Sequence, residues 1–385
     1  MKRASETKTA NTAGRLDEAP LRRLPLPIPM PLPPMEATRA DRLPLGEGWQ
    51  FEPKWDGFRC LVFRSEKEIV LQSKAGQPLS RYFPELVDAF MSLPEHSFVL
   101  DGEIVVFRNG VASFDDLLLR IHPAASRVTK LAHETPATFM AFDLLYSTTA
   151  GSLLNCPLEE RRSQLEQFFA SLPRTPRMSL SPYTNERALA ERWFQEFGPL
   201  GLDGIMAKNR QAPYRSGTRD AMVKVKHLRT ADCVVGGFRY AAKDAQREKN
   251  RRTAARSIGS LLLGLYDEDG LLHFVGFTSS FTRDARAALN KVIEPLRGGS
   301  GFTGRAPGGP SRWTVGESRE WERLDPVLVC EVEYDYFSQG RFRHGTKLLR
   351  WRPDKPPRQC TFDQLKRQAP EHSTEMLMTR LTAGR

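Results

Sequence analysis

The chain has 385 residues, of which 40% are hydrophobic and 27% are charged, and its formal net charge is +11 at pH 7. This length and composition favour a folded protein with two domains. No apolar run approaches the roughly 20 residues that a membrane-spanning helix needs. The five cysteines include no C-x-x-C pair, which excludes a zinc ribbon or a disulfide framework. The basic charge is compatible with a nucleic-acid partner, although ordinary enzymes can be as basic.

The N-terminal residues are polar and basic and lack the apolar stretch of a secretory signal, so we expect a cytoplasmic protein. Residues 1–23 show no apolar periodicity and are predicted to form a disordered basic arm. Prolines at alternate positions of residues 24–35 predict an extended, polyproline-like segment. We interpret this segment as a strap that packs against the first domain rather than as a motif that binds a partner.

From Trp49 the chain alternates predicted strands with predicted helices. Strands are predicted at residues 49–53, 58–64, 68–73, 97–107, 138–146, 203–208 and 222–227, and helices at 83–93, 158–172 and 186–197. These elements predict one domain over residues 24–229.

The remaining sequence changes character. Strands are predicted at residues 231–238, 260–266, 271–277, 328–337 and 347–352, with one helix at 283–296. Five strands and one helix in roughly 130 residues predict a small closed barrel such as an OB-fold. We place it at residues 230–362, followed by a tail at 363–385.

One segment of this second part, residues 239–256, carries seven Arg/Lys against two acidic residues. It is either a flexible loop or a contact with nucleic-acid phosphates, and its charge density favours the contact. The candidate residues are Arg247, Lys249, Arg251 and Arg252.

Lys54 ends a predicted strand and precedes the pair Asp56-Gly57, which is typical of a sharp turn. Such a turn can project the lysine into a cleft. A lysine amine is a nucleophile only when it is unprotonated, so we expect burial or nearby cations to lower its pKa. Taken alone, this K-x-D-G motif is better explained by an exposed turn.

Further charged residues of the first domain strengthen the case for a site. Glu103 lies in a hydrophobic strand, where a carboxylate without a partner is costly. Lys224 and Lys226 are two residues apart on a strand and therefore face the same side, which favours an anion between them. Glu103 and Asp203 could hold Mg²⁺, which takes oxygen ligands and bridges phosphates. This combination of lysines and carboxylates predicts a site that binds and splits a nucleoside triphosphate.

The ordered set K-x-D-G, S-K-x-G, D-G-E, F-D, D-G-I-M-A-K, K-x-K and R-x-D-K resembles the nucleotidyltransferase motifs of ATP-dependent DNA ligases. The resemblance covers residues 25–365 and is strongest to the minimal bacterial C-type ligases, which have only catalytic and OB domains. It implies an α+β fold in which an ATP-grasp-like nucleotidyltransferase domain precedes a small OB-fold β-barrel. It also implies ATP and Mg²⁺ or Mn²⁺ as cofactors and nicked duplex DNA as the substrate. The protein would act as a monomer at the bacterial nucleoid, in DNA repair or end joining with other repair proteins.

The same resemblance implies the chemistry. Lys54 would attack the α-phosphate of ATP, release pyrophosphate and form a lysyl-AMP phosphoramide. The AMP would then move to the 5′-phosphate at a nick, and the 3′-hydroxyl would attack that phosphate to seal the strand.

The resemblance also implies roles for single residues. Lys224 and Lys226 would hold the α-phosphate, Glu103 would contact the ribose and the metal ion, and Asp203 would bind the metal ion. Glu52 would lie at the adenine edge and Phe142 would stack on adenine. Arg59 and Lys74 would contact phosphates, and Lys208 would belong to the site without a specific role. The residues that would move in with the OB domain to orient pyrophosphate are Arg352, Asp354 and Lys355.

Two positions depart from the family pattern in ways that bear on the site. Lys74 stands where arginine is usual, so a bidentate phosphate contact becomes a single point charge. Asp203 replaces the usual glutamate, which shortens the reach of the carboxylate by about 1.5 Å and puts direct metal binding in doubt.

Other readings remain open at this stage. Phe142 could simply pack in the core, and residues 350–355 could be a solvated rim of the barrel. An RNA ligase or a GTP-using capping enzyme would share the lysine chemistry. A non-catalytic DNA-binding OB protein would not need Lys54, Glu103, Lys224 and Lys226 together.

Overall fold

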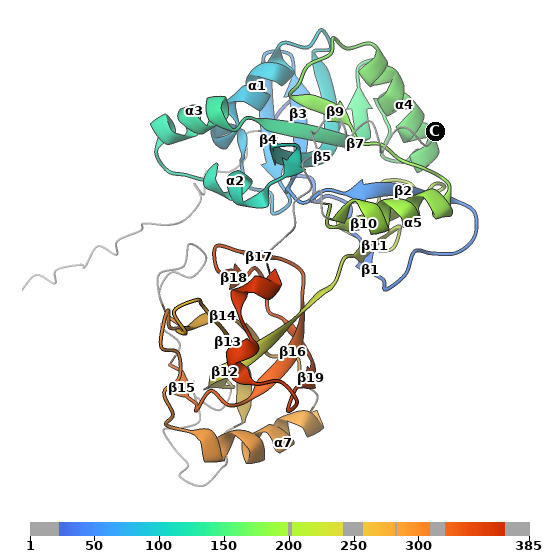
Figure 1. The fold of residues 1–385 in the computed structure, drawn as a ribbon. Coiled ribbons are helices and arrows are strands. Elements are labelled where there is room, and N and C mark those ends of the chain that lie inside the picture. Colours follow the sequence, from blue (N-terminus) through green and yellow to red (C-terminus); the bar gives the residue numbers. More distant parts are fainter. Residues whose placement is uncertain (1–22, 199–201, 242–256, 282, 309–319, 366–385) are drawn as a thin grey trace, which may run out of the picture.

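The computed structural model describes residues 23–198, 202–241, 257–281, 283–308 and 320–365 (Figure 1). Its elements form two units, which we call the first unit (residues 23–226) and the second unit (residues 229–365). In Figure 1 the first unit lies above the second, and the chain passes between them from β11 into β12. None of the described helices is long and apolar enough to cross a membrane.

Several predicted features lie outside the described residues. They are the predicted basic arm apart from Arg23, most of the predicted tail at 363–385, and the candidate DNA-binding residues Arg247, Lys249, Arg251 and Arg252.

The larger sheet of the first unit has the strand order β4-β3-β5-β7-β8, with β6 beside β5 and β9 beside β7. Its strands are β3 (Phe58–Ser65), β4 (Glu68–Ser73), β5 (Ser97–Arg108), β6 (Val111–Ala112), β7 (Ala137–Ser147), β8 (Gly151–Ser152) and β9 (Met178–Leu180). Around it lie helices α1 (Pro84–Met91), α2 (Phe114–Leu119), α3 (Ala125–Glu134) and α4 (Leu158–Ala170).

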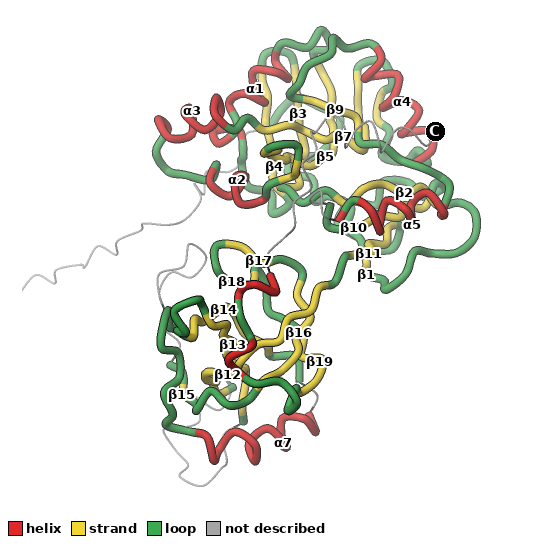
Figure 2. Tube along the Cα trace, in the orientation of Figure 1, coloured by secondary structure: helices red, strands yellow, loops and turns green. Residues whose placement is uncertain are grey.

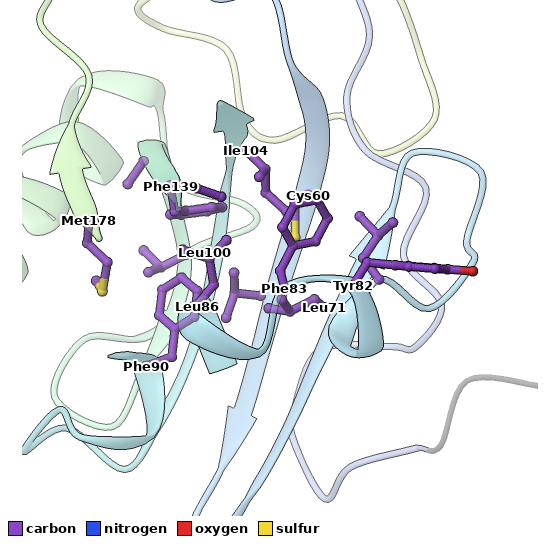
Figure 3. Close-up of a cluster of buried hydrophobic side chains, with 14 of the residues drawn as sticks. Cys60, Leu71, Tyr82, Phe83, Leu86, Phe90, Leu100, Ile104, Phe139 and Met178 are labelled. Carbon is purple, nitrogen blue, oxygen red and sulfur yellow. The ribbon is translucent and has the colours of Figure 1, made fainter. Parts of the chain in front are cut away.

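The main core of the first unit lies between one face of this sheet and α1. Figure 3 shows Leu86 and Phe90 of α1 directed at Leu100 and Phe139 of the sheet. All four side chains are buried. Burying apolar surface of this kind contributes about 25 cal/mol per Å², so this face fixes the sheet that carries the site residues.

The smaller sheet of the first unit has the order β1 (Thr38–Arg39), β11 (Met222–Lys226), β10 (Gly204–Asn209) and β2 (Trp49–Lys54). Helix α5 (Arg187–Glu196) covers it and buries Leu189 and Trp193 against Phe51 and Ile205. Because β2 leads directly into β3, the chain leaves the smaller sheet for the larger one immediately after Lys54. That residue therefore lies where the two sheets meet.

The second unit is a curled antiparallel sheet of order β14-β13-β12-β16-β19, with β15 beside β12. The elements are β12 (Arg229–Tyr240), β13 (Ile258–Tyr266), β14 (Leu272–Thr278), α7 (Arg283–Ile293), β15 (Glu322–Arg323), β16 (Val329–Tyr334), β17 (Phe337–Ser338), β18 (Arg341–Phe342) and β19 (Lys347–Trp351). A bridge between Thr278 and Thr346 joins the two edges of the sheet and closes it, as the predicted barrel requires. Helix α7 lies at the end away from the first unit (Figure 2).

The strands and longer helices predicted from the sequence are confirmed. Sequence-based prediction missed α2, α3, the β17–β18 hairpin and the short strands β1, β6, β8, β9 and β15. Helix α2 begins with a capping signal, because the Ser113 side chain accepts a hydrogen bond from the Asp116 N–H. The hairpin turns at Gln339-Gly340, where both φ angles are positive. That geometry fits a two-residue type I′ turn, for which Gln-Gly is a weaker sequence signal than Asn-Gly.

The proline-rich segment packs on the first unit, as the strap interpretation predicts. Ile28, Met30 and Leu32 are buried in a cluster with Phe63 of β3. The Gln72 amide accepts a hydrogen bond from the Leu32 N–H at 3.0 Å and donates one to the Leu32 carbonyl oxygen at 2.7 Å. The strap is thereby fixed in register, and it leads directly into the site.

Candidate active site

Lys54 is held at the junction of the two sheets by backbone contacts. Its carbonyl oxygen accepts a hydrogen bond from the Asp203 N–H at 2.9 Å. At Gly57, the last residue of K-x-D-G, an added Cβ would collide with the Ile104 carbonyl oxygen and lie 2.8 Å from Glu103 Cγ. Only glycine permits so close an approach of β3 to β5. The motif therefore serves to bring Lys54 beside Glu103.

The Lys54 ammonium lies in a ring of carboxylates. Its Nζ is 2.7 Å from Asp203 Oδ2, and the side chain is 20% exposed. Burial lowers the pKa of Lys54, but the Asp203, Glu103 and Asp56 carboxylates together raise it above its usual value. The expectation of a lowered pKa is therefore wrong for the protein without nucleotide. The sequence shows each acid but not that all three face one amine.

Glu103 is held toward its neutral form, whereas Lys54 is held toward its charged form. Burial raises its pKa to about 7, although Lys54 and Arg59 act against this shift. A carboxyl group with this pKa can accept or release a proton near neutral pH.

Asp203 connects Lys54 to the predicted phosphate strand. Its Oδ2 is also 3.2 Å from Lys226 Nζ, and its carbonyl oxygen accepts a hydrogen bond from the His227 N–H at 3.1 Å. Burial opposes ionisation of Asp203, but Lys54 and Lys226 hold its pKa below the usual value. The following Gly204 has φ +147°, and an added Cβ would meet the Val225 carbonyl oxygen. Asp203 is therefore fixed as a charged group between two lysines.

The described residues contain no group of three or more His, Cys, Asp or Glu that could hold a metal ion. Glu103 and Asp203 both lie close enough to Lys54 to raise its pKa. Two carboxylates are sufficient for Mg²⁺, which is commonly bound by one or two carboxylates together with substrate phosphates and water. The residues present therefore fit an ion that arrives with a nucleotide.

Lys224 supplies a cation without a carboxylate partner among the described residues. Burial lowers its pKa, and so does repulsion from Lys226, Lys54, Lys74 and Arg219. Five cations thus share one region of the site. Bringing an anion into this region would relieve the repulsion, which fits the predicted binding of phosphate.

Phe142 lies in a β-bulge that turns its ring toward the cations. Asp101 pairs with Asp143 and Gly102 with Ala141, which leaves Phe142 as the extra residue on β7. The Arg59 guanidinium is 4.6 Å and the Lys208 ammonium 4.4 Å from the centre of its ring. Phe142 is 9% exposed, so it both packs in the unit and borders the site.

A buried polar group lies next to this ring. Lys208 Nζ is 2.8 Å from Glu52 Oε2, and both side chains are almost fully buried. The Gln50 amide donates a hydrogen bond to Glu52 Oε1 at 2.7 Å. Apart from this carboxylate, the Lys208 ammonium has no acceptor among the described residues. Buried donors in this state favour a bound acceptor.

Arg59 is anchored by residues that the sequence analysis did not select. Its Nε and one terminal nitrogen donate to Asp101 at 2.5 and 2.6 Å, and the Tyr214 hydroxyl donates to the same carboxylate at 2.6 Å. The Tyr214 oxygen in turn accepts from the Met35 N–H at 3.1 Å, which ties the strap to this network. Asp101 is the first residue of the D-G-E motif and lies in a buried strand, and that was the available signal.

Three predicted residues are not brought to Lys54. Arg352 donates to Asp232 at 2.9 Å and to Asp354 at 2.8 Å, and Lys355 Nζ is 2.9 Å from Asp232. These contacts all lie within the second unit. Among the described residues, Arg352, Asp354 and Lys355 make no hydrogen bond or ion pair with the first unit.

The β17–β18 hairpin of the second unit faces the site instead. Arg343 donates to Asp56 Oδ1 at 2.8 Å, and Asp335 Oδ2 is 3.7 Å from Lys226 Nζ. Tyr336 is buried in the core of the first unit, with its ring centre 6.1 Å from that of Phe114. Sequence reasoning missed this contact because the hairpin looked like an extension of one long strand.

Comparison with known proteins agrees with the family resemblance of the sequence motifs. Residues 34–226 match the family model described as ATP dependent DNA ligase domain, and residues 254–355 match that described as ATP dependent DNA ligase C terminal region. The chain is 43% identical over 350 residues to DNA ligase C1 of Mycolicibacterium smegmatis, which covers 88% of this chain and 95% of that protein. It is 31% identical over 336 residues to the multifunctional non-homologous end joining protein LigD of Mycobacterium bovis, which covers 85% of this chain but 39% of LigD.

Among solved structures, one described as "DNA binding with a minimal scaffold: Structure-function analysis of Lig E DNA ligases" has a TM-score of 0.53. It covers 83% of this chain and 98% of the other chain at 16% identity. This similarity concerns the fold alone.

Proposed function

This chain belongs to the ATP-dependent DNA ligase family, and we propose that it seals nicks in duplex DNA through a lysyl-AMP intermediate formed on Lys54. One observation carries the residue-level proposal. The Lys54 ammonium and Lys226 lie on the same carboxylate, Asp203, at 2.7 and 3.2 Å. Attack on an α-phosphate requires one fixed amine beside cations that can hold the phosphate, and Asp203 fixes Lys54 beside Lys226.

In the first step Lys54 gives up its proton to solvent. The Lys54 nitrogen then bonds to the α-phosphorus of ATP, and the bond from that phosphorus to the bridging oxygen breaks to release pyrophosphate. Lys224 and Lys226 stabilise the negative charge that develops on the α-phosphate. Glu103 and Asp203 would hold Mg²⁺ or Mn²⁺, which neutralises phosphate charge when it is bound.

The base pocket consists of Phe142, Glu52 and Lys208. The Phe142 ring, which is 9% exposed, would stack on adenine, and the Glu52–Lys208 pair supplies a polar edge. Arg59 and Lys74 would contact phosphates. Arg59 is the more rigid of the two, because Asp101 and Met35 fix its guanidinium.

In the next steps AMP passes from Lys54 to the 5′-phosphate of a nick, and the 3′-hydroxyl then attacks that phosphate and releases AMP. Arg352, Asp354 and Lys355 would act in the first step, when the second unit presents this part of its surface to bound ATP. The observed arrangement places the hairpin with Arg343 at the site, which suits the later steps. The second unit must therefore change its orientation during the cycle.

We further propose that the protein acts as a monomer on nicked DNA in the bacterial cytoplasm. Its similarity to LigD supports a role in DNA repair or end joining, together with other repair proteins. Arg247, Lys249, Arg251 and Arg252 remain candidates for DNA contacts.

Mass spectrometry of the purified protein after incubation with ATP and Mg²⁺ tests the central step. We expect a mass increase of one AMP that pyrophosphate removes and that Lys54→Ala abolishes. An adduct that persists in Lys54→Ala would refute the role of Lys54. Parallel assays with GTP, and with nicked RNA in place of nicked DNA, would reveal a capping enzyme or an RNA ligase.

A further inference from the structure

Glu36 joins the strap to β1, and its carboxylate lies between two cations of the site. Its Oε2 is 2.9 Å from Lys74 Nζ and 2.9 Å from a terminal nitrogen of Arg219, whose Nε donates to it at 3.2 Å. The Glu36 N–H donates to the Thr218 carbonyl oxygen at 2.8 Å. The backbone of Glu36 is therefore fixed beside Arg219.

This carboxylate does not neutralise its surroundings. Lys74 and Arg219 lie close enough to Lys224 to lower its pKa by repulsion, and the three side chains together present three positive charges to the single negative charge of Glu36. The surplus matches the charge of a terminal phosphate, which carries about −1.5 to −2 near pH 7. The Glu36 side chain is 24% exposed, and Lys74 and Arg219 are 56% and 65% exposed, so an anion from solution can reach them.

We propose that Glu36 is a specificity-determining residue, because its carboxylate competes with phosphate for Lys74 and Arg219 and so favours a 5′-terminal phosphate over an internal phosphodiester. This inference deepens the proposed nick-sealing function and rests on it.

The preference follows from charge and tethering. An internal phosphodiester carries one negative charge, as Glu36 does, but it must arrive from solution. Glu36 is tethered, and a tethered group competes at an effective concentration in the millimolar range. A terminal phosphate brings almost twice the charge and three acceptor oxygens, so it can displace the carboxylate. Intact duplex would therefore gain little from these two cations, whereas a nick would gain more.

A different role for Glu36 gives the opposite expectation. If the carboxylate only positioned Lys74 and Arg219 for phosphate, its removal would loosen both side chains. Binding of nicked and intact DNA would then weaken together.

Binding measurements on Glu36→Gln separate these roles. The amide keeps the size of the side chain but removes its charge. Three duplexes of one sequence serve as probes, one intact, one with a 5′-hydroxyl nick and one with a 5′-phosphate nick, without divalent cation so that no sealing occurs. Glu159→Gln is the matched control, because Glu159 on α4 forms a comparably exposed ion pair with Arg210.

We expect Glu36→Gln to bind the intact duplex and the 5′-hydroxyl nick about fivefold more tightly, with a smaller gain for the 5′-phosphate nick. The preference for the phosphorylated nick would therefore fall. The slope of log affinity against log salt for intact duplex should become steeper by about 1, because freed cations now release counterions. Glu159→Gln should leave the preference unchanged.

An unchanged preference in Glu36→Gln, or weaker binding of all three duplexes, would overturn the inference. If either result is found while the wild-type protein forms lysyl-AMP and seals nicks, only the role of Glu36 is refuted. A wild-type protein that seals no nick would refute the proposed function itself.

Discussion

Arg343 of the second unit donates a hydrogen bond to Asp56 of the K-x-D-G turn at 2.8 Å. Its guanidinium also lies 3.5 Å from the centre of the Phe114 ring. Asp56 is two residues from Lys54 and is one of the acids that raise the pKa of Lys54. The position of the second unit is thus linked directly to the charge around the nucleophile.

Replacing Arg343 with Gln should slow sealing more than adenylylation. The observed contact holds the hairpin at the site and leaves Arg352 and Lys355 elsewhere, so its loss should disfavour the arrangement used after lysyl-AMP has formed. Losing a charged, partly buried hydrogen bond predicts about a tenfold slower sealing step. Single-turnover assays that start from ATP or from preformed lysyl-AMP measure the two steps separately.

Glu333→Gln provides the control for that experiment. It breaks another ion pair between the units, at 2.9 Å to Arg39, whose side chain is 45% exposed. An exposed pair of this kind contributes little, so both rates should stay close to those of the wild type. Equal slowing of both steps in Arg343→Gln would contradict the interpretation of this contact.

The raised pKa of Glu103 predicts a pH-dependent stability in the protein without nucleotide. Its pKa is about 7 in the folded state against an ordinary value of 4.5, so the folded state favours the neutral carboxyl group. The resulting stabilisation is fully present below pH 4.5 and is lost as the pH rises through about 7. Glu103→Gln removes this dependence.

Urea unfolding of both proteins at about pH 5 and about pH 8 provides the measurement. Over this range the free energy of unfolding of the wild type should fall relative to that of Glu103→Gln by about 1–2 kcal/mol. This figure is smaller than the full shift implies, because the side chain is partly exposed. Parallel pH profiles for the two proteins would mean that Glu103 titrates normally.

Phe142→Leu should raise the KM for ATP. Leucine preserves most of the packing but offers no aromatic face, and a stacked base contributes about 1–3 kcal/mol. We therefore expect an increase of about tenfold or more in KM, measured by the rate of lysyl-AMP formation at varied ATP concentrations. Phe139→Leu is the matched control, because Phe139 is fully buried in the core and should affect stability rather than KM. Equal KM values for Phe142→Leu and the wild type would exclude stacking.

Arg161→Met should strongly destabilise the first unit. Arg161 donates to both Asp143 oxygens, at 2.8 and 2.9 Å, and the two side chains are 0% and 3% exposed. The substitution leaves a buried carboxylate without its partner, which costs about 3–5 kcal/mol of unfolding free energy. Replacing Asp143 with Leu as well should recover part of this loss. Chemical denaturation of both variants tests whether Asp143, although it belongs to the F-D motif, has a structural role.

Much of the fold was predictable because its signals are local. Strands such as β5 and β7 are mostly apolar, and α4 and α5 have helical spacing. Most elements that the sequence analysis missed are short and are stabilised by contacts with distant parts of the chain. Helix α2 is one of the short elements, and β17–β18 looks continuous with β16 until Gln339-Gly340 forms a turn.

The candidate site divides in the same way. Lys54, Glu103 and Asp203 were identified because their motifs are ordered along the chain. Glu36 and Arg343 were not, because neither belongs to a motif and each acquires its role only by facing a residue that is distant in sequence.

The order and chemical type of the side chains determined the family, the candidate nucleophile and the supply of cations and acids. The tertiary structure alone decided how those charges balance. It placed three carboxylates around Lys54, which raises rather than lowers its pKa, and it set the hairpin rather than Arg352 and Lys355 at the site. The reason is physical, since a side chain's charge is written in the sequence while electrostatic energy depends on distance and burial.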